Sequence, residues 1–150
     1  MAIVSSTTTI SAAIDVVFAI AQDVEKFPDY MPNVKSLDVV ERDGNRVITR
    51  WVGEVEDLRI KIRWTEEDVW DPTAKTCAFR QLEGDYKTLR GIWRFTDLGD
   101  GTTRFDSELE LEYDVPLIGP LIKGLIAKKA KENLDQTLAA IKRAAESLGA

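Results

Sequence analysis

The sequence predicts an α+β fold in which a curved antiparallel sheet of about seven strands packs against one long C-terminal helix. Three observations lead to this prediction. Segments with strand character follow one another without long helices between them, turn residues separate them, and the end of the chain has the apolar spacing of a helix. Strands that are grouped in the chain, with helices toward its ends, are typical of antiparallel sheets.

The N-terminal part predicts one strand and two short helices. Residues 2–10 are rich in Val, Ile and Thr, which favour strands. Ser11 is placed to cap a helix that runs to about Asp23. The apolar face of this helix consists of Ile14, Val17, Phe18 and Ala21. Pro28 and Pro32 then leave room for at most a second, very short helix.

The middle of the chain predicts a meander of six strands. They cover residues 34–42, 45–53, 58–70, 75–83, 88–97 and 102–113. Asp43-Gly44, Gly84-Asp85 and the segment Leu98–Gly101 are turn signals between neighbouring strands. Apolar and charged residues alternate most clearly in 58–70 and 102–113, which predicts one buried and one solvated face.

A long amphipathic helix is predicted from about Ile118 or Leu121 to Ser147. Its apolar positions are Ile122, Leu125, Ile126, Ala130, Leu134, Leu138, Ile141, Ala145 and Leu148. A sheet of this size must twist and coil, whereas a single helix is straight, so the two do not fit together everywhere. We therefore expect a space between them that is either filled by large side chains or left as a cavity.

Composition excludes several classes of function. With no histidine in the 150 residues, histidine triads and histidine zinc sites are ruled out, and the single Cys77 makes neither a thiolate zinc site nor an internal disulfide. We expect no metal and no cofactor. The net charge of −6, without a basic block, argues against nucleic acid as a partner. No apolar stretch approaches the ~20 residues that span a bilayer and no signal peptide is recognisable, so we expect one cytoplasmic domain over residues 1–150.

Five segments occur in a recognisable order. They are Ile10–Phe18, Asp23–Pro32, Gly91–Phe95, Gly101–Phe105 and the C-terminal helix. In this order they resemble the START-like superfamily of polyketide cyclases, Bet v 1-type proteins and coenzyme Q-binding proteins. The resemblance covers essentially the whole chain and depends on the ordered set, not on one motif. It implies a helix-grip fold with a cavity for apolar ligands such as quinones, lipids or polyketides, and leaves catalysis open.

The candidate ligand-binding residues are those expected to face the space between sheet and helix. They are Phe27, Tyr30, Met31, Trp51, Ile62, Trp64, Glu66, Phe79, Gln81, Trp93, Leu109, Leu111, Tyr113, Ile122, Leu125, Ile126 and Asn133. Trp64 and Glu66 would offer an aromatic wall and a carboxylate to a flat ligand with a polar head. Alternatively, Trp64 fills the core and Glu66 lies at the wet rim. A metal site formed by Glu66, Glu67 and Asp68 is disfavoured, because adjacent strand residues point to opposite faces.

Other polar candidates also have structural alternatives. The Gln81 amide would meet a ligand oxygen or, with slight preference, bond to backbone or water. Tyr113 is best interpreted as a boundary residue with a wet hydroxyl. Asn133 and Thr137, on or beside the apolar face of the last helix, would bond either a ligand or strand backbone.

Two apolar clusters lie in segments broken by Pro or Gly, at the end where ligands enter in the family. They consist of Phe27, Tyr30 and Met31, and of Leu117, Ile118, Leu121 and Leu125. We favour a gate there over a plug at the end of the core. Nearby lysines would make transient contact with an anionic membrane surface or, as we favour, form a solvated helix face. These lysines are Lys123, Lys128, Lys129 and Lys131.

The favoured hypothesis is a binding or carrier module for a quinone, lipid or polyketide-like molecule. The second is a polyketide aromatase/cyclase or dehydratase, for which Tyr113, Glu66 and Gln81 are weak acid–base candidates without a convincing pair. The third is a protein-interaction module that uses the groove. Four tryptophans and five phenylalanines could fill the cavity completely, which would favour the third. The sequence does not indicate an oligomeric state.

Overall fold

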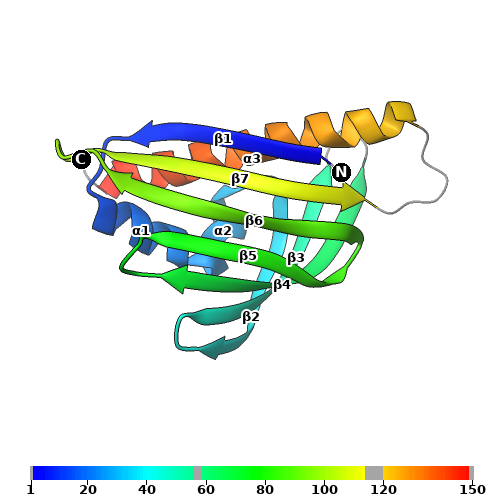
Figure 1. The fold of residues 1–150 in the computed structure, drawn as a ribbon, viewed down its shortest axis with the longest axis horizontal. Coiled ribbons are helices and arrows are strands. Elements are labelled where there is room, and N and C mark those ends of the chain that lie inside the picture. Colours follow the sequence, from blue (N-terminus) through cyan, green and yellow to red (C-terminus); the bar gives the residue numbers. More distant parts are fainter. Residues whose placement is uncertain (1, 56–58, 114–119, 149–150) are drawn as a thin grey trace.

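The computed structural model describes residues 2–55, 59–113 and 120–148. It confirms the predicted α+β, helix-grip fold: a curved antiparallel seven-stranded sheet in the order β1-β7-β6-β5-β4-β3-β2, with a long C-terminal helix (Figure 1). The elements are β1 (Ala2–Ile10), α1 (Ile14–Gln22), the 3-10 turn η1 (Val24–Lys26), α2 (Phe27–Tyr30), β2 (Val34–Asp43), β3 (Arg46–Val55), β4 (Ile60–Asp71), β5 (Thr76–Gly84), β6 (Tyr86–Asp97), β7 (Thr103–Tyr113) and α3 (Pro120–Leu148).

The start of α1 differs from the prediction. Ser11 is not its cap: the N-cap residue is Ala13, and no side chain caps this helix end. The Ser11 backbone N–H instead donates to the Glu146 carboxylate of α3 at 2.8 Å. Residues 11–13 are therefore used to turn the chain out of β1, and α1 begins after them.

The long helix covers only part of the concave face of the sheet. Among the described residues, α3 packs mainly against β1, α1 and β7, and Figure 1 shows it running behind β1 and β7. Ser6 of β1 donates to the Asp135 carboxylate of α3 at 2.6 Å, which ties the two elements together. Strands β3, β4 and β5 lie farther along the sheet, where Phe18 of α1 packs against Trp70 and Phe27 of α2 packs against Trp51.

The buried core is divided into two clusters. The larger one joins α1, α3 and the inner faces of the sheet, and includes Phe18, Phe105 and Ile141. The smaller one consists of Leu89, Leu111 and Ile126. Members of both clusters line one cavity, which therefore lies where the two meet. No helix in the described part of the chain is both long enough and apolar enough to cross a membrane.

Strands β5 and β6 separate beside this cavity. Their regular pairing runs only from Thr76 to Arg80 of β5. Beyond it, the Gln81 side chain takes the place of a backbone rung: its amide nitrogen donates to the Tyr86 carbonyl at 2.8 Å, and its oxygen accepts from the Tyr86 N–H at 3.2 Å. For Gln81, the sequence slightly favours a hydrogen bond to backbone or water over one to a ligand, and in the structure the bond is to backbone.

Gly84, where β5 ends, permits a close approach to β4. Its φ is +149°, and a Cβ at this position would lie 2.5 Å from the Cα and Cβ of Trp64. Because the clashing atoms belong to strand backbone and its first side-chain carbon, they cannot move aside cheaply. Only glycine allows β5 to end against Trp64 in this way.

We expect Gly84→Ala to lower the free energy of unfolding by about 1–3 kcal/mol, because it adds a clash to an unfavourable backbone conformation. Urea denaturation followed by tryptophan fluorescence measures this loss. The matched control is Gly99→Ala, since Gly99 also has a positive φ, +85°, but nothing within 4 Å of the added methyl group. Equal losses in the two variants would contradict the close-approach explanation.

Candidate ligand cavity

A cavity of about 160 Å³ lies between the concave face of the sheet and α3. The sheet contributes residues from β2 to β7, and α3 contributes Ala130, Asn133, Leu134 and Thr137. An apolar protein cavity of roughly 150 Å³ is large enough for one benzene molecule. The aromatic residues therefore do not fill the space completely, and its volume corresponds to that of a single-ring molecule.

Stacked aromatic rings form one wall. The Trp51 and Trp64 rings lie 5.5 Å apart and 11° from parallel, and the Tyr86 ring meets Trp64 edge-on at 5.5 Å. Trp51 and Trp64 are directly opposite each other in the β3–β4 ladder, so strand register places them in contact. They offer flat apolar surface to a ligand.

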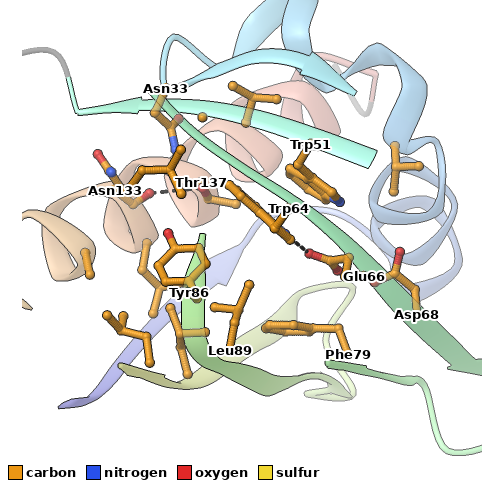
Figure 2. Close-up of a pocket in the computed structure, with 18 of the residues that line it drawn as sticks. Asn33, Trp51, Trp64, Glu66, Asp68, Phe79, Tyr86, Leu89, Asn133 and Thr137 are labelled. Atoms are coloured by element: carbon orange, nitrogen blue, oxygen red, sulfur yellow. Dashed lines mark hydrogen bonds between the residues drawn. The ribbon is translucent and has the colours of Figure 1, made fainter. Parts of the chain in front are cut away.

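Two carboxyl groups are buried in the same cavity. Glu66 and Asp68 are 6% and 4% exposed and lie two residues apart on β4, so both point to the concave face. The Trp64 indole N–H donates to Glu66 at 2.7 Å (Figure 2). On the other side, the Thr49 hydroxyl donates to Asp68 at 2.8 Å and accepts from the Trp51 indole N–H at 2.8 Å.

The two carboxyls differ in protonation. Burial raises the pKa of Glu66 well above its usual range, and the neighbouring Asp68 carboxylate raises it further. Burial also raises the pKa of Asp68, although hydrogen bonds from Glu66 and Thr49 oppose that rise. The hydrogen bond between the two carboxyls raises the pKa of Glu66 and opposes the rise at Asp68, which favours Glu66 as its donor. The result is a carboxylic acid–carboxylate pair inside an apolar cavity.

Amides and hydroxyls lie toward the other end of the cavity. Figure 2 shows Asn33, Asn133, Thr137 and the Tyr86 hydroxyl there, with Trp64 between them and the carboxyl pair. The Thr137 hydroxyl is already used, since it donates to the Asn133 backbone carbonyl at 3.0 Å. The Asn33 side-chain oxygen is buried and has no hydrogen-bond partner among the described residues. Burial, followed by Tyr113 and then by the acidic Glu66 and Asp85, raises the pKa of the Tyr86 hydroxyl, so it stays protonated.

The structure brings about half of the predicted site residues to the cavity. Those that line it are Trp51, Ile62, Trp64, Glu66, Phe79, Trp93, Leu109, Leu111 and Asn133. Those that do not are Phe27, Tyr30, Met31, Gln81, Tyr113, Leu125 and Ile126. The side chain of Ile122 lies outside the described residues.

The residues outside the cavity have structural partners instead. Phe27 and Met31 are 0% and 1% exposed within the main core, so they occupy the position of a plug rather than an exposed gate. The Tyr30 ring packs on Phe27 at 6.0 Å, and Tyr113 packs edge-on against Tyr86 at 5.9 Å. Leu117 and Ile118, and the side chain of Leu121, lie outside the described residues, so the second half of the proposed gate stays a prediction.

Two of the four lysines named above, Lys129 and Lys131, take part in ion pairs, and the side chain of Lys123 lies outside the described residues. Lys131 contacts Asp135 at 2.7 Å and Lys129 contacts Glu132 at 3.1 Å. These pairs are what the solvated-face interpretation expects, whereas contact with a membrane stays a prediction.

Several cavity residues were not predicted. Asp68 has the same strand parity as Glu66, and this spacing of two is the sequence signal that puts both carboxyls on one face of β4. Tyr86 was missed because β6 begins two residues before its predicted start. Asn33 follows Pro32, where periodicity gives no signal. Among the described residues, no three His, Cys, Asp or Glu side chains are grouped so as to hold a metal ion.

Comparisons with known proteins are consistent with this geometry. A family model described as polyketide cyclase/dehydrase and lipid transport matches residues 10–137. The chain is similar to the crystal structure of TTHA0849 from Thermus thermophilus, with 31% identity, a TM-score of 0.92 and 99% coverage of both chains. It also shares its fold with the Zhui aromatase/cyclase from Streptomyces sp. R1128, at 21% identity, a TM-score of 0.88 and coverage of 96% and 93% of the two chains.

A sequence relative is the ribosome association toxin RatA of Vibrio cholerae, 25% identical over 115 residues that make up 77% of this chain and 78% of the relative. The predicted START-like resemblance is confirmed by the family match and by the structural neighbours.

We expect Glu66→Gln to stabilise the protein increasingly as pH rises. With its pKa raised from the usual 4.5, folded Glu66 holds a proton that the unfolded chain has released, so wild-type stability falls as pH increases through this window. Glutamine preserves the shape and both hydrogen bonds without titrating. The stability gap between variant and wild type should widen by up to about 1.4 kcal/mol per pH unit.

Urea denaturation at a series of pH values from about 5 to 8 measures this gap. The control is Glu67→Gln on the opposite face of β4, because hydrogen bonds from Arg46 and Arg80 lower the pKa of Glu67. Above the ordinary carboxyl pKa, Glu67 is ionised in both the folded and the unfolded chain. The difference in free energy of unfolding between Glu67→Gln and the wild type should therefore stay constant over the same pH range. A constant gap for Glu66→Gln would mean that Glu66 is not a buried acid.

Proposed function

This chain belongs to the polyketide cyclase/dehydrase and lipid transport family, and we propose that it binds a small hydrophobic molecule in the cavity under α3. The observation that carries the proposal is an apolar space of about 160 Å³ that contains a buried, hydrogen-bonded carboxyl pair. Such a site combines what a ligand pocket needs, namely apolar walls and a few polar groups at fixed positions.

The apolar walls supply affinity. Trp51, Trp64, Leu109 and Leu111 come from three different strands and present ring faces or branched side chains to the space. A ligand that replaces solvent there gains roughly 25 cal/mol for each Å² of apolar surface that it buries. The cavity is smaller than the about 300–1,000 Å³ of typical drug-sized sites, so a single-ring or short-chain body is favoured over a long one.

The polar groups supply orientation. Glu66 and Asp68 are held by indole and hydroxyl donors that are themselves fixed by the β3–β4 register. A ligand head group that reaches them meets partners whose positions are already determined, so little ordering is required on binding.

A second candidate function is acid–base catalysis of a cyclase or dehydratase type. It is favoured by the Glu66–Asp68 pair, which places a protonated and an ionised carboxyl together in an apolar site. The fold shared with the Zhui aromatase/cyclase is consistent with it. The size of the cavity opposes it for long substrates, since a polyketide chain would require the site to widen. Binding is therefore the primary proposal.

Native mass spectrometry of the purified protein tests binding, with organic extraction and identification of any released molecule. We expect an adduct of small mass and apolar character. Leu109→Trp should reduce the retained amount by about tenfold or more, because the larger ring fills the cavity. Trp64→Ala should also weaken retention, because it removes a wall and a donor to Glu66.

The control is Leu82→Trp, since Leu82 is 43% exposed and does not line the cavity. It should retain the ligand at the wild-type level. A clean apo mass, together with no binding in a screen of quinones, lipids and single-ring compounds, would contradict the proposal and direct attention to protein partners.

A further inference from the structure

We infer that the ligand of this cavity is a hydrophobic amine, whose ammonium group lies between the Glu66–Asp68 pair and the tryptophan faces. This inference rests on the proposed function, because it specifies the chemical class that the same cavity takes. Four features of the lining lead to it. The lining is acidic, the donors around the carboxyl pair are already hydrogen-bonded, aromatic rings lie beside the pair, and one buried acceptor has no partner among the described residues.

The lining holds acidic groups without a cation. Its acidic members are Glu54, Glu66 and Asp68, and the described lining contains no Lys or Arg. Glu54 already pairs with Lys35 at 3.7 Å. Arg46 and Arg80 belong to the strands on either side of β4. They lie on the other face of the sheet, where they contact Glu67 at 2.6 and 3.1 Å. A buried carboxylate without a countercharge is costly, and a ligand cation would remove that cost.

The donors around the pair are already in use. The Trp64 indole N–H is committed to Glu66, and the Trp51 indole N–H is committed to Thr49. The Thr49 hydroxyl is committed to Asp68. What the two tryptophans still offer a ligand is therefore the π surface that their mutual stacking leaves uncovered, rather than their N–H groups. Such faces attract cations, by about 0.5–2 kcal/mol per contact.

The far end of the cavity also requires a donor. The Asn33 side-chain oxygen is buried without a partner among the described residues, and it is an acceptor. This observation is independent of the carboxyl pair and shows that no donor of the described lining satisfies this oxygen. A molecule that brings N–H or O–H groups into the cavity satisfies these acceptors, whereas a carboxylate ligand would add a further acceptor and a repelling charge.

Three probes of nearly equal shape separate these possibilities: benzylamine, benzyl alcohol and benzoate. Each has a single ring, which matches a cavity of about 160 Å³, and at pH 7 their heads are cationic, neutral and anionic. Titration followed by the indole N–H signals of Trp51 and Trp64 in ¹H–¹⁵N NMR spectra reports on the cavity directly, since both indoles belong to the carboxyl network.

We expect benzylamine to bind about tenfold or more tightly than benzyl alcohol, which corresponds to at least about 1.4 kcal/mol, and benzoate to leave the signals unchanged. In the double variant Glu66→Gln/Asp68→Asn, the preference for the amine should disappear while binding of the alcohol persists. Glu67→Gln removes the same charge from the opposite face of β4 and should keep the preference. The amide variants are nearly isosteric, and their dispersed NMR spectra establish that they fold.

Equal or tighter binding of benzyl alcohol to the wild type would overturn the inference but leave the proposed function intact. Persistence of the amine preference in the double variant would also overturn it, because the charge would then act from elsewhere. If none of the three probes shifts the indole signals, the cavity does not take single-ring ligands and the inference is overturned, whereas the proposed function is decided separately by native mass spectrometry.

Discussion

The structure depends on one geometric constraint: a single straight helix cannot cover the whole concave face of a coiled seven-stranded sheet. In the described chain, α3 packs mainly on β1, β7 and α1. The inner faces of β3 and β4 meet the short N-terminal helices instead, since Phe27 of α2 packs against Trp51 at 6.1 Å and Phe18 of α1 against Trp70 at 5.5 Å. Large rings reach into this region from the strands, among them Trp51, Trp64 and Trp93. The space that they do not fill is the cavity. A cavity is thus the direct consequence of closing a strongly curved sheet with one helix.

The same constraint explains the chemistry inside the cavity. The polar side chains on the inner faces of β3 and β4 find their hydrogen-bond partners within these two strands. The β3–β4 register meets this need by placing Thr49 opposite Glu66 and Trp51 opposite Trp64. The network that results is closed on the protein side, because each donor in it is used. The carboxyl pair still lacks a countercharge, because the described lining contains no Lys or Arg. Packing, hydrogen bonding and charge therefore all lead to a cavity that complements an apolar ligand with a donor head.

The elements of the fold could be predicted because their signals are local. Alternation identified the strands to within about two residues, and the three- and four-residue spacing identified α3. Strand parity also placed Trp64 and Glu66 on the concave face. What could not be predicted depends on contacts distant in the chain. Ser11 does not cap α1 because its N–H meets Glu146, 135 residues away. Phe27 and Met31 are candidate ligand contacts by sequence, and the packing of α2 and of the residue that follows it buries both in the main core. The volume left between the rings is likewise a property of the assembled side chains, which no residue pattern encodes.

The central claim is that Glu66 and Asp68 form a dry carboxyl pair that shares a proton beside a ligand-sized space. The most direct measurement is a ¹³C NMR titration of the side-chain carboxyl carbons, with Glu66 and Asp68 assigned by substitution. The account predicts that Glu66 stays protonated to a pH well above the usual glutamate range and that its titration is coupled to that of Asp68. If both carboxyls instead titrate at the values of exposed side chains, water fills the site, the pair is not buried, and the account of the cavity is wrong.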